Sequence, residues 1–184
     1  MKKLIIAITL LGFTVATYAQ DKYFTRSGQA TFFSSTPVED IKAINESAVC
    51  VLDVNNGNVE VSMLNKSFQF KKALMQEHFN ENYMESNTYP KSKFKGQVVD
   101  IDKVDLDKDG AQNVTVKGDL TIHGETHTVE VPGTIEVNDG NLMAHTVFMV
   151  TPEDYRIEIP GMVRENIAEE IEVTIDLNLE PWKQ

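Results

Sequence analysis

The chain of 184 residues has one cysteine, few basic residues and no long apolar run after its start. The single cysteine, Cys50, excludes an internal disulfide. It lies in the apolar run AVCVLDV without a basic neighbour, so we interpret it as a buried thiol and not as a nucleophile. The 17 lysines and arginines stand against 28 aspartates and glutamates, a formal net charge of −11. This balance disfavours nucleic acid and anionic membrane surfaces as partners.

The sequence also lacks the short motifs that mark common enzyme classes. It contains no G-x-S-x-G elbow, no P-loop and no glycine pattern for a dinucleotide. His78 and His145 are single histidines in mixed surroundings, which are more often structural than reactive. We therefore expect no catalytic residues and predict that the protein is not an enzyme.

One acidic stretch matches half of a calcium site. DLDKDG at 105–110 has the spacing of the first half of an EF-hand loop. Position 12 of such a loop needs a bidentate glutamate, and Val116 stands there. We interpret the stretch as a solvated hairpin turn closed by Asp109-Gly110.

Two histidines flank a second predicted turn. His123, Glu125 and His127 cluster around Gly124-Glu125, and a hairpin could bring the two histidines face to face. The spacing is not HExxH, so exposed polar residues beside a turn are the favoured interpretation and no metal is expected. A metal-dependent enzyme that uses the two histidines stays open as an alternative.

The first nineteen residues have the pattern of a signal peptide. Lys2 and Lys3 precede the apolar run LIIAITLLGFTVA, and the small residues Thr17 and Ala19 mark a cleavage site. The run is too short to span a membrane, so we expect no integral span. We predict cleavage after Ala19, a single domain over 20–184 and a periplasmic or secreted location. Loss of the two lysines would change the formal net charge from −11 to −13.

Short strand patterns joined by turn residues dominate the remainder. Asn55-Asn56-Gly57 separates SAVCVLDV from NVEVSML, and Asp139-Gly140 precedes NLMAHTVFMV. Only TPVEDIKAI at 36–44 and FKKALMQEHFNENYME at 70–85 are typical of helices, too few for βαβ crossovers. The fold class is therefore predicted as all-β, mainly antiparallel, with a sheet that must close to protect its edges.

Apolar residues line one face of the last strand and both faces of the strand before it. The pattern places Ile171, Val173, Ile175, Leu177 and Leu179 on one side of the last strand. In NLMAHTVFMV, Leu142 and Phe148 share one face, and Met143, Val147 and Met149 share the other. Two interpretations stay open: a filled core under a covering helix, or a barrel lumen that holds an apolar chain.

Two blocks of sequence resemble a known family. FQFKKALMQEHFNENYMESNTYPKSKFKG at 68–96 and GDLTIHGET at 118–126 are similar to motifs of the YceI-like family, and DYRIEIP at 154–160 fits the end of its pattern. The resemblance covers roughly residues 46 to 180. It implies a lipocalin-like extended β-barrel of about eight strands with one or two short helices. Members of that family are exported and hold a polyisoprenoid, an isoprenoid quinone or a fatty acyl ligand.

The resemblance also implies a carrier that sequesters a long apolar, lipid-like ligand, with no cofactor beyond a bound isoprenoid or isoprenoid quinone. Whether the chain forms a homodimer stays open. The helical block at 70–85 is expected to lie across the barrel beside the ligand. A packed interaction or stress-response module without a small-molecule ligand is the alternative. The expected tunnel lining is Phe68, Phe70, Leu74, Met75, Phe79, Tyr83, Met84, Phe94, Leu120, Ile122 and Phe148.

Overall fold

A computed structural model describes residues 22–182, and the expected signal peptide lies outside the described residues. Strands dominate this part of the chain. The strands are β1 Lys22–Ser35, β2 Asp40–Asp53, β3 Asn58–Leu64, β4 Gln69–Phe70, β5 Lys91–Val99, β6 Gly110–Ile122, β7 Glu125–Asn138, β8 Asn141–Val150 and β9 Ile171–Pro181. The longest, β1, β2 and β7, have 14 residues each. Within residues 22–182, no helix is long and apolar enough to cross a lipid bilayer.

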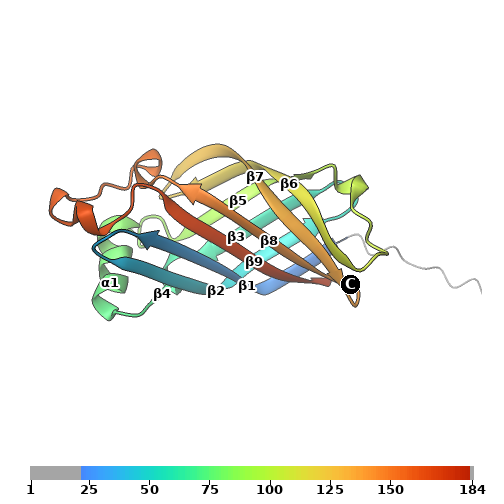
Figure 1. The fold of residues 1–184 in the computed structure, drawn as a ribbon, viewed down its shortest axis with the longest axis horizontal. Coiled ribbons are helices and arrows are strands. Elements are labelled where there is room, and N and C mark those ends of the chain that lie inside the picture. Colours follow the sequence, from blue (N-terminus) through green and yellow to red (C-terminus); the bar gives the residue numbers. More distant parts are fainter. Residues whose placement is uncertain (1–21, 183–184) are drawn as a thin grey trace, which may run out of the picture.

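Eight of the strands close into an antiparallel barrel (Figure 1). Each strand pairs with the next long strand along the chain, from β1 through β2, β3, β5, β6, β7, β8 to β9. β9 then pairs with β1, which leaves the long strands without an open edge. The two-residue β4 adds to β2 through the pair of Ala43 with Phe70. The predicted all-β, lipocalin-like barrel of about eight strands is confirmed.

Two hairpins are closed by residue pairs with positive φ. Asp139-Gly140 has φ values of 49° and 77°, as a tight primed turn requires. The predicted Gly124-Glu125 turn lies one residue earlier, since His123 and Gly124 have φ values of 50° and 80°. Glu125 already pairs with Ile122 as the first residue of β7. Both central positions of such a turn need a left-handed backbone. His123 and Gly124 have it and Glu125 does not, so the turn lies one residue before the predicted one.

The acidic stretch at 105–110 is not a tight hairpin turn. β5 ends at Val99, a 3₁₀ turn η3 (Ile101–Lys103) follows, and β6 begins at Gly110. The carboxylate of Asp105 accepts a hydrogen bond from the N–H of Asp107 (3.1 Å). The side-chain amide of Gln112 accepts from the backbone N–H of Asp105 and donates to its carbonyl oxygen. The acidic side chain thus stabilises a longer loop, and Gly110 opens the next strand rather than closing a two-residue turn.

Of the two predicted helices, the first is wrong and the second is confirmed. The N–H groups of Val38 and Glu39 donate to the hydroxyl of Thr36, as at a helix start, but β2 begins at Asp40. Ile41 then pairs with Ser34 of β1, so strand pairing overrides the local capping pattern. The block at 70–85 forms α1 (Ala73–His78), which continues as the π-helical turn η2 (Phe79–Tyr83).

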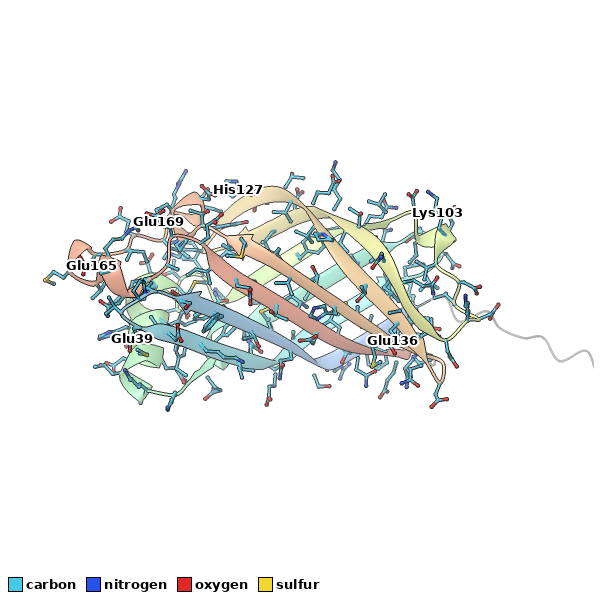
Figure 2. The ribbon with its side chains drawn as sticks, viewed as in Figure 1. Glu39, Lys103, His127, Glu136, Glu165 and Glu169 are labelled. Carbon is cyan, nitrogen blue, oxygen red and sulfur yellow. The ribbon has the colours of Figure 1, made fainter. Side chains whose placement is uncertain are left out.

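The two ends of the barrel differ. The end that holds η3 is filled by a core of buried side chains, among them Cys50, Leu52, Ile101, Leu142 and Leu179. The other end carries α1, η2 and two 3₁₀ turns, η4 (Pro152–Tyr155) and η5 (Gly161–Asn166) (Figure 1). In Figure 2, Lys103 and Glu136 mark the filled end, and Glu39, Glu165 and Glu169 mark the helix-bearing end.

Candidate ligand-binding cavity

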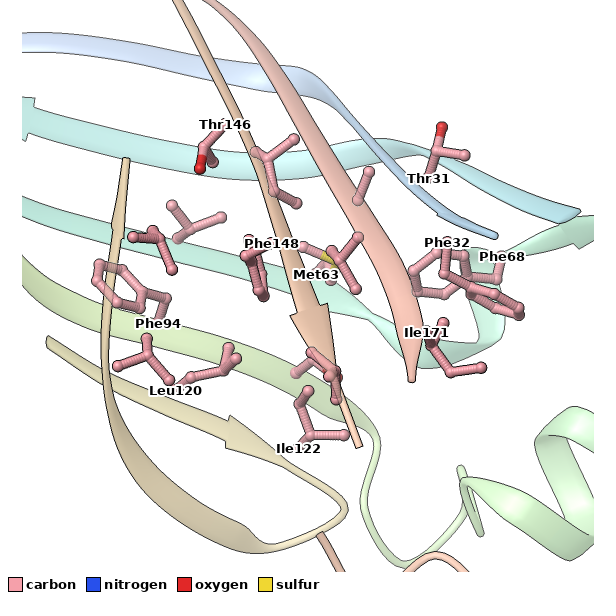
Figure 3. Close-up of a pocket in the computed structure, with 18 of the residues that line it drawn as sticks. Thr31, Phe32, Met63, Phe68, Phe94, Leu120, Ile122, Thr146, Phe148 and Ile171 are labelled. Carbon is pink, nitrogen blue, oxygen red and sulfur yellow. The ribbon is translucent and has the colours of Figure 1, made fainter. Parts of the chain in front are cut away.

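The interior of the barrel contains a cavity of about 460 Å³. Side chains from strands around the barrel point into the same space (Figure 3). All five apolar residues predicted to share one face of β9, from Ile171 to Leu179, lie on the cavity wall. The volume falls in the usual range for small-molecule sites. The barrel is therefore not filled throughout, and the packed-core interpretation does not describe it.

β8 shows how the two apolar faces of one strand are used. Phe148 lies on the cavity wall and Leu142 is buried in the core at the filled end, as their shared face predicts. Val147 and Met149 point outward and are 39% and 51% exposed. The inner face thus contributes to the cavity wall, while Val147 and Met149 are partly exposed apolar residues on the outer surface, as many folded proteins have.

Four phenylalanines from distant parts of the chain meet at the helix-bearing end. The ring of Phe79 lies 5.3 Å from Phe32, 5.6 Å from Phe68 and 5.0 Å from Phe70, measured between centroids. All four rings also lie on the cavity wall. Offset and edge-to-face pairs at such distances are attractive. The aromatic group therefore fixes the helical block to the barrel and gives the cavity an aromatic wall at this end.

A pair of glycines shapes the opposite wall. Gly96 of β5 pairs with Gly118 of β6, and the ring of Phe94 lies across the pair. A Cβ on either glycine would come within 2.6 or 2.8 Å of the ring tip. Side chains at these positions would therefore displace Phe94, whose ring forms part of the wall (Figure 3).

Ten of the eleven residues expected to line the tunnel lie on the cavity wall. These are Phe68, Phe70, Met75, Phe79, Tyr83, Met84, Phe94, Leu120, Ile122 and Phe148. Leu74 does not belong to the wall, and its side chain is 60% exposed. The helix directs Met75 toward the barrel and Leu74 into solvent. Contact of the ten residues with a ligand stays a prediction.

The sequence interpretation missed a large part of the wall. Phe32 of β1, Met63 of β3 and Val131 of β7 all line the cavity. The alternation of NVEVSML and of THTVEVPGTIEV could have identified the last two, since their apolar residues fall at every second position. β1 gave little signal because its inner face mixes aromatic, small and hydroxyl side chains.

Some polar residues of the cavity wall lie along the barrel strands, among them Thr134 and Thr146, and others lie at the helix-bearing end. Glu39, His78 and Asn166 lie on the wall at that end, where His78 is also exposed, and we call this place the mouth of the cavity. A Glu39 carboxylate oxygen accepts a hydrogen bond from Lys72 Nζ (2.7 Å), and the other lies 3.5 Å from Asn166 Nδ2. The hydrogen bond from Lys72 holds the pKa of Glu39 below its usual value. The cavity is thus an apolar space with a polar mouth.

Two histidines of the β6–β7 hairpin are hydrogen-bonded to η4, beside the mouth. His123 Nδ1 lies 3.1 Å from the carbonyl oxygen of Tyr155, and its Nε2 lies 2.9 Å from a carboxylate oxygen of Glu85. His127 Nε2 lies 2.8 Å from the carbonyl oxygen of Asp154. A carbonyl oxygen can only accept, so both histidines donate to the η4 segment. The two rings thus connect the β6–β7 hairpin to η4 by hydrogen bonds. They do not face each other as a pair of metal ligands would.

The described residues also lack a metal cluster and an activated thiol. Within residues 22–182, no group of three or more histidine, cysteine, aspartate or glutamate side chains is placed to hold a metal ion. Burial raises the pKa of the Cys50 thiol to about 12. A thiol with so high a pKa is protonated at neutral pH and is a poor nucleophile.

The whole chain can be compared with known proteins at this point. A family model, the YceI-like domain, matches residues 11–179. The chain belongs to the YceI-like family. The match includes both blocks that carry the resemblance. In the structure these blocks form β4, α1, η2, the first part of β5, the end of β6 and the β6–β7 turn. No curated protein matches the sequence.

Solved structures share the fold of this YceI-like chain. A polyisoprenoid-binding domain from Saccharophagus degradans, implicated in plant cell wall breakdown, aligns with a TM-score of 0.74 at 14% identity over 88% of this chain and 99% of its own. Burkholderia cenocepacia BcnA aligns with a TM-score of 0.68 at 17% identity over 83% and 95%. A Campylobacter jejuni YceI protein reaches 0.56 at 15% identity over 100% of both chains. At such identities the likeness establishes the fold alone.

Proposed function

We propose that this YceI-like protein is an exported carrier without enzymatic activity. It sequesters a long apolar ligand, such as a polyisoprenoid, an isoprenoid quinone or a fatty acyl chain, in its cavity. The largely apolar cavity inside the barrel, with polar residues at its helix-bearing end, is the observation that carries the proposal. The polyisoprenoid-binding activity in the name of the Saccharophagus degradans domain supports it, because that domain shares the fold.

Burial of hydrocarbon supplies enough free energy for such a function. Each methylene group removed from water contributes about 0.8 kcal/mol, so ten groups contribute about 8 kcal/mol. Association and ordering of the chain oppose part of this gain. A dissociation constant of roughly micromolar order therefore needs a chain somewhat longer than ten carbons. No catalytic group is required, since the ligand leaves as it entered.

The expected signal peptide supports export to the periplasm or the medium. An apolar ligand that has to cross an aqueous compartment needs a container there, and a single-cysteine domain folds without a disulfide in either redox state. The excess of acidic side chains keeps the carrier apart from anionic surfaces during transit.

A displacement titration tests the proposal directly. The domain 20–184 is saturated with the fluorescent apolar probe N-phenyl-1-naphthylamine, and geranylgeraniol is added until the probe is released. We expect Phe79→Glu to lose probe and prenyl alcohol together, because a carboxylate would enter the apolar wall. Leu74→Glu, on the same helical block but outside the cavity, is the matched control and should bind as the wild type does. Equal binding by both variants would refute the assignment of the cavity as the ligand site.

A further inference from the structure

Three large apolar side chains project from the helix-bearing end into solvent. Val38 is 60% exposed, Leu74 is 60% exposed and Met162 is 95% exposed. They are the most exposed large hydrophobic residues within 22–182. Each comes from a different segment: the β1–β2 turn, the first turn of α1, and η5. We call these three side chains the apolar rim.

The apolar rim surrounds the mouth of the cavity. Lys72, two residues before Leu74, is bonded to Glu39, the neighbour of Val38. Asn166 of η5 lies 3.5 Å from the same carboxylate, so all three segments meet at Glu39. Figure 1 shows the β1–β2 turn, α1 and η5 at the same end of the barrel.

Acidic residues outnumber basic ones near the apolar rim, as they do in the whole chain. The segments 36–40, 71–78 and 161–170, the last of which includes Glu169 and Glu170, carry three basic residues and six acidic ones. The full sequence carries 17 basic residues against 28 acidic ones. Such an end is repelled by an anionic surface, whereas a zwitterionic surface, which has no net charge, does not repel it. The charge pattern therefore matches a surface of zwitterionic lipid headgroups.

The size of the rim argues against a protein partner. A stable protein interface buries about 800 Å² on each side, with a contiguous apolar centre. Three separate side chains on three turns do not form such a surface. Single apolar side chains on protruding turns can instead enter the boundary between headgroups and acyl chains, where each adds a modest, reversible contribution.

We propose that the apolar rim docks the barrel reversibly on a zwitterionic lipid surface, with the mouth of the cavity facing the bilayer. An apolar ligand then passes between bilayer and cavity without entering bulk water. This inference rests on the proposed function, since it describes how the same cavity is loaded and emptied.

Vesicle flotation tests the docking step. The wild-type domain 20–184 is mixed with phosphatidylcholine vesicles, and the bound fraction is compared with that of the triple variant Val38→Asp, Leu74→Asp, Met162→Asp. We expect the triple variant to lose at least tenfold in vesicle affinity and to keep probe binding in solution. The matched control is Val147→Asp, Met149→Asp, which changes exposed apolar residues on the outer wall of β8 and should float as the wild type does.

Transfer kinetics test the loading step. The rate at which a fluorescent fatty alcohol leaves the loaded protein should rise in proportion to the concentration of phosphatidylcholine vesicles. The triple variant should transfer at a rate that does not depend on vesicle concentration, as expected for release through water. Raising the salt from 50 to 500 mM should leave the wild-type rate unchanged within a factor of two, because the zwitterionic surface has no net charge whose interaction with the protein could be screened.

Several results would overturn the inference. The first is that the wild type binds the probe but does not float, and the second is that the triple variant floats as the wild type does. The third is that the protein binds only phosphatidylglycerol vesicles. The fourth is that the rim substitutions change self-association of the protein and nothing else. A protein that floats but binds no apolar probe would instead refute the proposed function. The two failures are therefore distinguishable.

Discussion

Val131 of β7 offers a direct test of an open interior. Its side chain lies on the cavity wall, and within 22–182 it joins none of the three packed clusters of the core. Substitution by tryptophan, Val131→Trp, would place an indole where the structure has free space. In a filled core the same change would force neighbouring side chains from their rotamers and cost about 1–3 kcal/mol.

The expected effects on stability and binding differ in size. We expect the free energy of unfolding of Val131→Trp to change by less than about 1 kcal/mol, because the indole enters space that is already there. If the indole displaces about four methylene groups of a bound chain, binding weakens by about 3 kcal/mol. That free energy corresponds to a loss of affinity on the order of 100-fold.

Urea unfolding and displacement of the naphthylamine probe by geranylgeraniol measure the two effects. Val147→Trp is the matched control, since Val147 points outward from the neighbouring strand β8 and is 39% exposed. It should leave both the unfolding midpoint and the affinity near their wild-type values. A loss of more than about 2 kcal/mol in Val131→Trp would mean that the interior is packed. Unchanged affinity would mean that the ligand lies elsewhere.

Three further predictions concern the supporting structure. Cys50 should not react with Ellman's reagent in the folded protein. Its thiol has a pKa of about 12 in the folded protein and about 8.5 in the unfolded chain, so only the unfolded chain loses the proton between these values. Above pH 8.5 the free energy of unfolding, measured in urea, should therefore fall by up to ~1.4 kcal/mol per pH unit relative to Cys50→Ala. His123→Asn keeps the positive φ of the turn but removes the hydrogen bond to the Tyr155 carbonyl and the contact with Glu85. The free energy of unfolding should fall by about 1–3 kcal/mol, and amides of η4, which contains Tyr155, should exchange faster. Gly118→Ala should destabilise by about 2 kcal/mol or more, since its Cβ would meet backbone atoms, whereas Gly161→Ala meets nothing within 4 Å and should be neutral in a thermal melt.

Alternation in the sequence predicted the walls of the barrel wherever one face was uniformly apolar. β9 is the clearest case, because every second residue from Ile171 to Leu179 is aliphatic and all five lie on the cavity wall. The same pattern arises whether the interior is filled or hollow. The volume of the interior depends on how far opposite strands stand apart, which is a property of barrel closure and not of any one strand.

Local patterns failed where distant contacts decide the structure. Residues 36–44 carry a cap and a proline typical of a helix start, but pairing of Ile41 with Ser34 draws the segment into β2. The helical block was predicted correctly, yet periodicity alone did not reveal which side faces the barrel. Contact of Phe79 with Phe32, Phe68 and Phe70 selects that side, and it leaves Leu74 outside.

The central claim is that the cavity holds an apolar chain in the exported protein. Native mass spectrometry of protein purified from the exported fraction, followed by organic extraction, tests it most directly. The account predicts a bound isoprenoid, quinone or fatty acyl species that is lost in Val131→Trp. An empty wild-type protein that also refuses added geranylgeraniol would contradict it.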